Sequence, residues 1–377
     1  MSAKATVFEF TSYTYEPEKK RVVFQYKTEF EGREPLTWTE AVLLPKIPRC
    51  PTPVKMLESL HIILGISYWK FYCVTNIKLP YGLSKGEADF WNIVYKKGLG
   101  EFFYKNKLNP NISPKFQATN HKSQTISNFK FQISNSTRQC LVGIGGGKDS
   151  IVSAELLKEA KFDFTSFHIE TNKPSDLVSN VIKAIGAGHK TAPGFAPSLK
   201  IQRFLDEKAY QPHPYNGHIP ISAIYAFLGV FSCILYGYDS FIVSNEHSSN
   251  FGNIKYKGLE VNHQWSKSFE FETLFQSYLK HISTDISYFS LLRPFYEIRI
   301  VKMFAKYKQY FPLFSSCNRN FTTKGLPAQA GNGQSKLWCG QCAKCVFAFT
   351  LLSAFLNKKE LLTIFGKNLY QDTALLP

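Results

Sequence analysis

The chain has 377 residues, of which 44% are hydrophobic and 15% aromatic, so it is long enough and apolar enough to bury the cores of two globular domains. This composition excludes a disordered protein. Lys and Arg number 45 against 28 Asp and Glu, and the net charge of +17 favours anionic partners such as nucleotides, nucleic acids, acidic metabolites or a membrane surface.

Three features bear on where the protein works. The start of the chain, MSAKATVFEFTSYTYEPEKK, has no apolar segment behind a basic end, so we expect no secretory signal and a cytoplasmic protein. Residues 219–238 carry no charge, but Pro220, two glycines and a strand-like DSFIVSN after them favour a buried helix over a membrane span. The eight cysteines should be reduced thiols, and a cluster among them indicates metal or redox chemistry.

Residues 1–115 predict a smaller N-terminal α+β domain. ATVFEFTSYTYE and RVVFQYKTEF are rich in aromatic and β-branched residues and flank a charged turn, which is typical of a hairpin. Helical spacing of apolar residues follows at 56–72 and in ADFWNIVYKKGLGEFFYKNKL. The chain then turns polar and rich in Asn and Ser, so we place a linker at residues 116–136.

Residues 137–377 alternate strands and helices. CLVGI, DFTSFHIE and DSFIVSN resemble buried strands, and SIVSAELLKEA, SDLVSNVIKAIGA and the uncharged segment predict helices between them. This alternation predicts an α/β fold with a mostly parallel sheet and helices on both faces. Ligands of such sheets bind at the carboxyl ends of the strands, where the loop GGGKDS lies.

The glycine loop matches neither common nucleotide-binding pattern. A G-x-G-x-x-G fingerprint counted from Gly143 would need glycine at Lys148, and a Walker A loop would need Ser or Thr at Asp149. The loop does offer glycine N–H groups that can approach a phosphate at the start of a helix. Lys148 can neutralise phosphate oxygens, Asp149 can hold Mg²⁺, and Ser150 can donate a hydrogen bond.

The loop resembles the PP-loop of the ATP pyrophosphatase superfamily, usually written S-G-G-x-D-S, with Gly145 at the serine position. The resemblance implies a C-terminal domain like the adenine nucleotide alpha hydrolases, in which an acceptor oxygen attacks the α-phosphorus of ATP and releases pyrophosphate. It implies an ATP site made by Gly145, Gly146, Gly147, Lys148, Asp149 and Ser150. None of these groups is the acceptor, so the rest of the chain selects the substrate.

Three polar segments are candidates to bind and act on the acceptor. The first two follow or precede buried elements: SNEHSSNFGN contains Asn245 and Glu246, and PYNGHIP contains Asn216 and His218. The third, EVNHQWSKSFEFE, offers groups for proton transfer and carboxylate recognition, namely His263, Lys267, Glu270 and Glu272, with Asn262 beside them. For each residue the alternative is a solvated polar surface or a cap on a helix.

In the order and spacing of its motifs the chain resembles the bacterial UDP-N-acetylmuramoyl-L-alanyl-L-glutamate epimerase (MurL) family. The motifs are GISYWKFY, GLGEFFY, GGGKDS, NGHIP, SNEHSSN, VNHQWSKSFEFE, YFSLLRP, FSSCNRNF and WCGQCAKC. The resemblance implies inversion of the terminal L-Glu of this peptidoglycan precursor to D-Glu, with ATP and Mg²⁺ used and AMP and diphosphate released. We then expect His263 and one of Glu270 and Glu272 near the α-carbon, with Lys267 balancing carboxylate or enolate charge.

A cysteine cluster near the end of the chain has the spacing C-x21-C-x2-C-x2-C. Its members are Cys317, Cys339, Cys342 and Cys345. Four thiolates are a common structural zinc site, and the cluster resembles that of 7-cyano-7-deazaguanine synthases. Structural Zn²⁺ is favoured over thiols that transfer protons or electrons and over unliganded core cysteines.

The main alternative is another PP-loop enzyme, one that modifies a nucleobase or thiolates tRNA, for which the positive charge and the cysteines would be natural. A non-catalytic nucleotide-binding protein is a second alternative. The extent of the family resemblance and the intact Lys148-Asp149-Ser150 favour the epimerase. We therefore expect a small-molecule partner, the UDP-muramoyl dipeptide, and neither nucleic acid nor a membrane.

Overall fold

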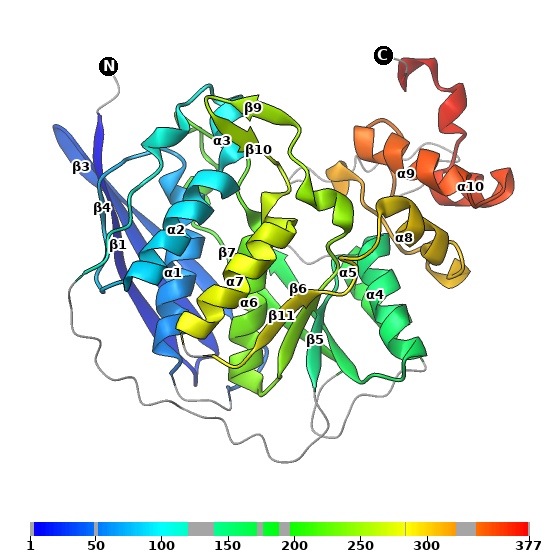
Figure 1. Ribbon diagram of the computed structural model, residues 1–377, viewed down its shortest axis with the longest axis horizontal. Coiled ribbons are helices and arrows are strands. Elements are labelled where there is room, and N and C mark those ends of the chain that lie inside the picture. Colours follow the sequence, from blue (N-terminus) through cyan, green and yellow to red (C-terminus); the bar gives the residue numbers. More distant parts are fainter. Residues whose placement is uncertain are drawn as a thin grey trace.

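Within the described residues, a nine-stranded mixed sheet runs through the molecule in the order β11-β8-β5-β6-β7-β3-β2-β1-β4 (Figure 1). The computed structural model describes residues 4–48, 52–119, 139–171, 176–187, 197–282, 284–321 and 337–375. The strands of this sheet are β1 (Ala5–Glu16), β2 (Arg21–Phe30), β3 (Arg33–Leu43), β4 (Ile77–Lys78), β5 (Cys140–Gly143), β6 (Phe164–Thr171), β7 (Ser198–Phe204), β8 (Ser240–Val243) and β11 (Ser287–Ser290). A separate hairpin pairs β9 (Ile254–Tyr256) with β10 (Leu259–Val261).

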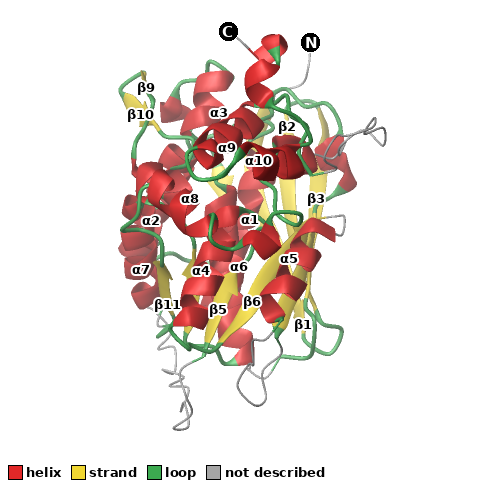
Figure 2. Ribbon diagram, turned by 90° about the vertical axis from the view of Figure 1, so that its right-hand side faces the viewer, coloured by secondary structure: helices red, strands yellow, loops and turns green. Residues whose placement is uncertain are grey.

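Helices pack on both sides of the sheet (Figure 2). One apolar core contains side chains of α1 (Val54–Trp69), α2 (Lys85–Gly98), α3 (Gly100–Lys105), α6 (Ile221–Tyr236) and α7 (Phe269–His281). A second core contains those of α4 (Lys148–Glu159), α5 (Asp176–Gly186), α8 (Glu297–Phe304), α9 (Ala343–Ser353) and α10 (Lys358–Phe365). The sheet therefore separates two layers of helices, as in an α/β fold.

The five strands β7, β6, β5, β8 and β11 are parallel to one another. Numbered along the chain, their spatial order is 3-2-1-4-5, the order of doubly wound sheets. The structure thus confirms the α/β class and the expected strands at β5, β6 and β8. β7 and β11 were not among the expected strands: SYFS is only four residues long, whereas SLKIQRF does carry the alternation of a strand.

The N-terminal strands continue the same sheet. β3 pairs antiparallel with β7, and β1, β2 and β3 follow one another as an antiparallel meander. The core is shared as well, since Trp91 of α2 stacks on Phe227 of α6 at a centroid distance of 5.2 Å. The division into domains at residues 1–115 and 137–377 stays a prediction: residues 120–136 of its linker lie outside the described part, and the sheet and core are shared by the two regions.

Local signals explain where the principal helices begin and end. Ser84 and Glu87 form a reciprocal capping box at the start of α2, and Gly237 takes a left-handed φ of +76° where α6 stops. The uncharged segment forms α6, a 16-residue helix that is buried against α1. No helix of the described part is long and apolar enough to cross a membrane.

Candidate functional site

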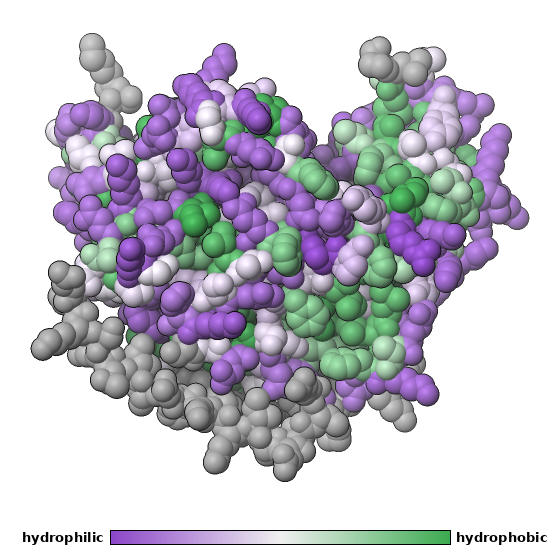
Figure 3. Space-filling view, viewed as in Figure 1, coloured by the Kyte–Doolittle hydropathy of each residue, from purple (hydrophilic) through white to green (hydrophobic). Residues whose placement is uncertain are grey.

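The carboxyl ends of the parallel strands bring the polar motifs to one edge of the sheet. β5 ends at Gly143 and leads into the glycine loop, β8 ends at Val243 and leads into SNEHSSN, and β11 ends at Ser290 and leads into LLRP. The strand order reverses at β5, with α4 on one face and α6 on the other, and ligands of doubly wound sheets bind at such a reversal. In the space-filling view a notch separates the C-terminal helices from the main body (Figure 3).

The glycine loop turns the chain from β5 into α4. The Ile144 N–H still donates to the Phe167 carbonyl at 2.7 Å, and Gly146 then takes a left-handed φ of +81°. A Cβ on Gly146 would lie 2.0 Å from Leu177, so glycine is required there. Gly147 precedes α4 and provides no side-chain cap, which leaves the first N–H groups of a 12-residue helix available to an anion.

The Ser150 side chain forms hydrogen bonds within the glycine loop. Its hydroxyl is buried, donates to the Gly147 carbonyl at 3.0 Å and accepts from the Gly145 N–H at 3.4 Å. A Cβ on Gly145 would meet no atom within 4 Å, so the position that usually carries serine opens into free space. Gly145 is thus the exposed edge of the loop, and Ser150 is the donor behind it.

Lys148 lies at the centre of a charged group beside the loop. Its ammonium contacts Asp149 at 2.6 Å and Glu297, the first residue of α8, at 2.5 Å. Burial disfavours the charged form, but the two carboxylates outweigh burial and raise the pKa of Lys148. Burial also raises the pKa of Glu297. The negative charges of Asp149 and Glu246 raise it further, and the positive charge of Lys148 opposes the shift. Three carboxylates and one lysine therefore surround the start of α4.

Arg293 joins the SNEHSSN segment to the segment around His263. Its guanidinium donates to the Glu246 carbonyl at 3.0 Å, to the Lys267 carbonyl at 2.6 Å and to the Glu272 carboxylate at 2.8 Å. The other oxygen of Glu272 accepts from the Ser290 N–H at 3.2 Å. Glu272 is therefore buried and holds Arg293, which leaves it no free oxygen toward a substrate in this arrangement.

The other predicted residues of these segments also have partners. Glu270 pairs with Lys97 of α2 and accepts from the Trp265 indole at 2.9 Å. The Asn262 amide donates to the Ser249 carbonyl at 2.8 Å, and its oxygen accepts from the Gln264 N–H at 2.8 Å. A further contact links the Asn245 side chain to the hydroxyl of Tyr288, whose ring is buried. These side chains shape the loops that carry Glu246 and Lys267.

Asn216 and His218 belong to a second polar group at the start of α6, and His263, after β10, lies within electrostatic range of His218. Lys70, at the end of α1, donates to the Asn216 side chain at 3.0 Å and to the Gly217 carbonyl at 3.1 Å. Burial, together with the nearby charge of Arg203, lowers the pKa of Lys70 to about 8. His263 is exposed, and its charge acts on His218. The structure thus places His218 and His263 within electrostatic range of each other and places Glu270 and Glu272 in other contacts.

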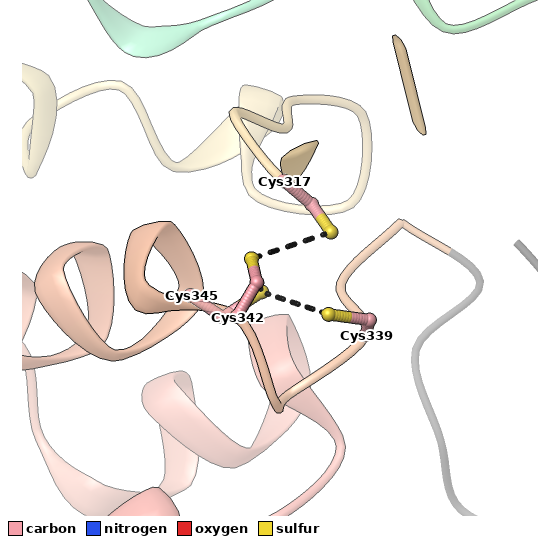
Figure 4. Close-up of side chains that lie close together, drawn as sticks. All are labelled: Cys317, Cys339, Cys342 and Cys345. Atoms are coloured by element: carbon pink, nitrogen blue, oxygen red, sulfur yellow. Dashed lines mark hydrogen bonds between the residues drawn. The ribbon is translucent and has the colours of Figure 1, made fainter. Parts of the chain in front are cut away.

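The four clustered cysteines converge from two stretches of the chain, one with Cys317 and the other with Cys339, Cys342 and Cys345 (Figure 4). Their sulfurs all lie within 4.8 Å of one another, with Cys317 3.9 Å from Cys342, and Cys345 3.7 Å from Cys339. Thiolates bound tetrahedrally at about 2.3 Å from Zn²⁺ lie about 3.8 Å apart, so the spacing fits that ion. Burial would raise the pKa of the Cys342 thiol, but hydrogen bonds from the Asn318 and Cys345 backbone outweigh it and lower that pKa to about 7.

The cysteine cluster is attached to the glycine loop through Ser315. The Ser315 N–H donates to the Gly146 carbonyl at 3.1 Å, and its hydroxyl accepts from the Cys317 N–H at 3.0 Å. Lys344 stands between two of the cysteines in the chain and lies near the charges of Lys267, Asp149 and Lys148. Desolvation by the surrounding chain and the charge of Lys267 lower the pKa of Lys344, and Asp149 opposes this shift.

The sequence analysis did not single out several residues of this site. Arg293, Ser315 and Lys344 stand inside the motifs YFSLLRP, FSSCNRNF and WCGQCAKC, which were the available signal. Glu297 stands three residues after YFSLLRP and has no motif of its own. Its role depends on the approach of α8 to α4, which only the tertiary structure shows.

Comparisons with known proteins show which family the chain belongs to. Two family models match, the MurL N-terminal domain over residues 1–291 and the MurL C-terminal domain over residues 313–377. The chain is similar to the UDP-N-acetyl-alpha-D-muramoyl-L-alanyl-L-glutamate epimerase of Xanthomonas oryzae pv. oryzae, with 36% identity over 322 residues, 84% of this chain and 66% of that protein. Proteins of the same name from Micromonospora sp. and Salinispora tropica are each 32% identical over 98% of this chain, and 79% and 78% of their own lengths are covered. The chain thus spans just under two thirds of the Xanthomonas relative and more of the other two.

Proposed function

The chain belongs to the MurL family, and from that premise we propose that it is an ATP-dependent epimerase that inverts the terminal L-Glu of UDP-N-acetylmuramoyl-L-alanyl-L-glutamate to D-Glu. The observation that carries the ATP dependence is the uncapped, glycine-rich start of α4 at the reversal of strand order, with Lys148 and Asp149 beside it. A cytoplasmic location, which suits a nucleotide-linked substrate, is part of this proposal.

Adenylation explains why an epimerase would use ATP. Removing the α-proton of a free glutamate would build a second negative charge next to its carboxylate, which a base alone can hardly achieve. Transfer of AMP to the carboxylate gives a mixed anhydride, whose acyl carbon can delocalise the carbanion. Reprotonation from the opposite side then inverts the centre, and water releases AMP.

The residues around the glycine loop suit the first half-reaction. The loop N–H groups and Ser150 would hold the departing diphosphate, and Lys148 would exchange its carboxylate contacts for phosphate oxygens. Carboxylate oxygens are the ligands that Mg²⁺ prefers, so Asp149, with Glu297 and Glu246 nearby, would hold this ion against ATP. Lys267 and Lys344 add positive charge on the side where the dipeptide carboxylates would lie.

For the second half-reaction we propose His263 as a proton-transfer group. Its side chain has no hydrogen bond or ion pair in the described part of the chain, whereas both predicted glutamates are engaged. Asn245, Asn262 and Asn216 would support substrate binding by shaping the loops that carry the contacting residues. Glu270 and Glu272 stay predictions as bases, and their contacts favour a structural role.

We also propose that the four cysteines hold a structural Zn²⁺. Their spacing, and the N–H groups directed at Cys342, match a closed thiolate site. The ion would fix Cys317 and Lys344 and, through Ser315, the glycine loop.

The decisive experiment incubates the protein with ATP, Mg²⁺ and UDP-N-acetylmuramoyl-L-alanyl-L-glutamate, then hydrolyses the product and resolves the glutamate enantiomers. We expect D-Glu, AMP and diphosphate together, and loss of all three by about 10²-fold or more in Lys148→Met. Lys158→Met is the matched control, because Lys158 lies on the same helix but pairs with Glu155 away from the loop.

An absence of D-Glu above a reaction without ATP would overturn the proposal. Turnover of ATP that depends on tRNA or a nucleobase, with a steep salt dependence, would instead indicate a nucleobase-modifying or tRNA-thiolating enzyme.

A further inference from the structure

A turn at Gly98 and Gly100 brings two histidine-bearing loops together. A Cβ on Gly98 would lie 3.0 Å from Pro220 and 3.6 Å from Trp265, and one on Gly100 would lie 3.8 Å from Cα of Val261. The two glycines thus allow the α2–α3 junction to touch both the loop before α6 and the segment after β10. A side chain at Gly98 would press on Pro220 and would be in ordinary contact with Trp265.

The histidines stand next to these contact points. His218 precedes Pro220 by two residues, and His263 lies midway between Val261 and Trp265. Burial lowers the pKa of His218, the charges of His263 and Lys70 lower it further, and Glu101 opposes them. At neutral pH His218 is therefore uncharged and able to accept a proton.

Glu101, the second residue of α3, is the carboxylate that faces His218. Its Oε2 lies 3.6 Å from Nδ1 of His218, and both side chains are about one quarter exposed. A carboxylate on this side favours the tautomer with hydrogen on Nδ1, which leaves Nε2 as the basic atom. Within the described residues, the side chain of Glu101 has no other ion pair.

Two neighbouring imidazoles are well matched to an inversion. Near neutral pH an imidazole can act as a base in its neutral form and as an acid in its protonated form. An epimerisation needs one base and one acid at the same time, on opposite sides of one carbon. Glu270 and Glu272 cannot form such a pair here, since each is bound to its own cation, Lys97 and Arg293.

On the basis of the proposed function, we infer that His218 and His263 move the glutamate α-proton, one on each side of the α-carbon, and that Glu101 positions His218. The lone pair of the neutral ring takes the α-proton, and the electrons of the C–H bond pass into the C–C(O) bond to give an enolate. The protonated ring then gives its N–H proton to the other side of the carbon: the C=C electrons of the enolate form the new C–H bond, and the N–H electrons remain on nitrogen as its lone pair. After the reaction the first ring is protonated and the second is neutral, and proton exchange with solvent restores the starting state.

The test follows the exchange of the α-proton for deuterium in D₂O, with ATP, Mg²⁺ and either the L-Glu or the D-Glu form of the dipeptide precursor. The unaltered enzyme should exchange both forms. His218→Asn should lose exchange of one form by about 10²–10⁴-fold and retain exchange of the other, and His263→Asn should show the reverse pattern. Both variants should still release AMP and diphosphate, and His281→Asn, at the exposed end of α7, should match the unaltered enzyme.

Glu101 is tested by its effect on His218. Because Glu101 raises the pKa of His218, Glu101→Gln should lower that pKa and move the acid limb of the kcat/KM profile to lower pH, with about 10-fold slower exchange of the form that depends on His218. Glu101→Asp should restore part of the rate and return the limb toward its original position. A slower rate with an unmoved limb would overturn the positioning role.

Three outcomes separate the two proposals. No ATP-dependent exchange in the unaltered enzyme would overturn the proposed function. Exchange in the unaltered enzyme with full exchange in both histidine variants would overturn the histidine pair alone. If His218→Asn lost exchange of both forms and also lost diphosphate release, His218 would act in adenylation or folding, and the histidine pair would be overturned.

Discussion

At the glycine loop, three successive glycines have three different surroundings. Gly146 has a left-handed φ and touches Leu177, Gly147 approaches the Ser315 carbonyl, and Gly145 has open space on its Cβ side. A residue with a side chain is therefore excluded at Gly146 and accepted at Gly145. The loop would thus tolerate the serine that the PP-loop pattern usually places at its first position.

We predict that Gly145→Ser folds normally and binds ATP at least as tightly as the unaltered protein, because it adds a hydroxyl donor without strain. Gly146→Ser is the matched variant, and it should lose about 1–3 kcal/mol of stability from its backbone conformation alone. Urea unfolding and the KM for ATP measure both effects. A large loss of stability in Gly145→Ser would show that the space beside Gly145 is filled in solution.

The positions of some single residues could be predicted from the sequence, and the contacts of others could not. Lys148, Asp149 and Ser150 were predictable as a group because they are adjacent in the chain and their surroundings are a strand end and a helix start. The partners of Glu270 and Glu272 were not predictable, since Lys97 and Arg293 come from other elements. A polar residue in a motif indicates that a site is near, and its contacts decide whether it faces the substrate.

At the scale of elements, the cysteine cluster fixes the start of α9 and the segment that supports the glycine loop. α9 begins directly after Cys342, and its own first turn contains no acidic residue to stabilise it. The sequence predicted the cluster from the close spacing of Cys339, Cys342 and Cys345, with Cys317 as the fourth thiol, and from a resemblance to a known zinc site. It did not predict the link through Ser315, which joins residues far apart in the chain.

We predict that the purified protein carries about one Zn²⁺ per chain and that Cys342→Ser or a strong chelator removes it. Loss of the ion should lower the melting temperature and raise the KM for ATP, since Ser315 would no longer be held against Gly146. Cys73→Ser is the control, because Cys73 is a buried thiol with no part in the cluster. Metal content below half an equivalent, with no response to chelator, would contradict the zinc site.

At the scale of the whole molecule, the junction of β3 with β7 joins the N-terminal meander to the doubly wound strands. The sequence predicted the hairpin and the parallel strands separately, because both patterns are local. It did not predict that they form one sheet, since β7 pairs with a strand more than 150 residues earlier. The junction also contains a fully buried ion pair, between Glu40 of β3 and Arg203 of β7.

This ion pair provides a test of the continuous sheet. Arg203 donates to both oxygens of Glu40, at 2.6 and 3.2 Å, and also to the Ser67 hydroxyl at 2.8 Å. Glu40→Leu leaves the guanidinium buried without its counter-charge, so we expect a loss of about 3–5 kcal/mol in the free energy of unfolding. The double variant Glu40→Leu with Arg203→Met removes both charges and should recover most of that loss, because apolar side chains of similar size can replace a buried pair. Urea titrations of the single and double variants measure the difference, and equal losses in the two would show that β3 and β7 are not held together in this way.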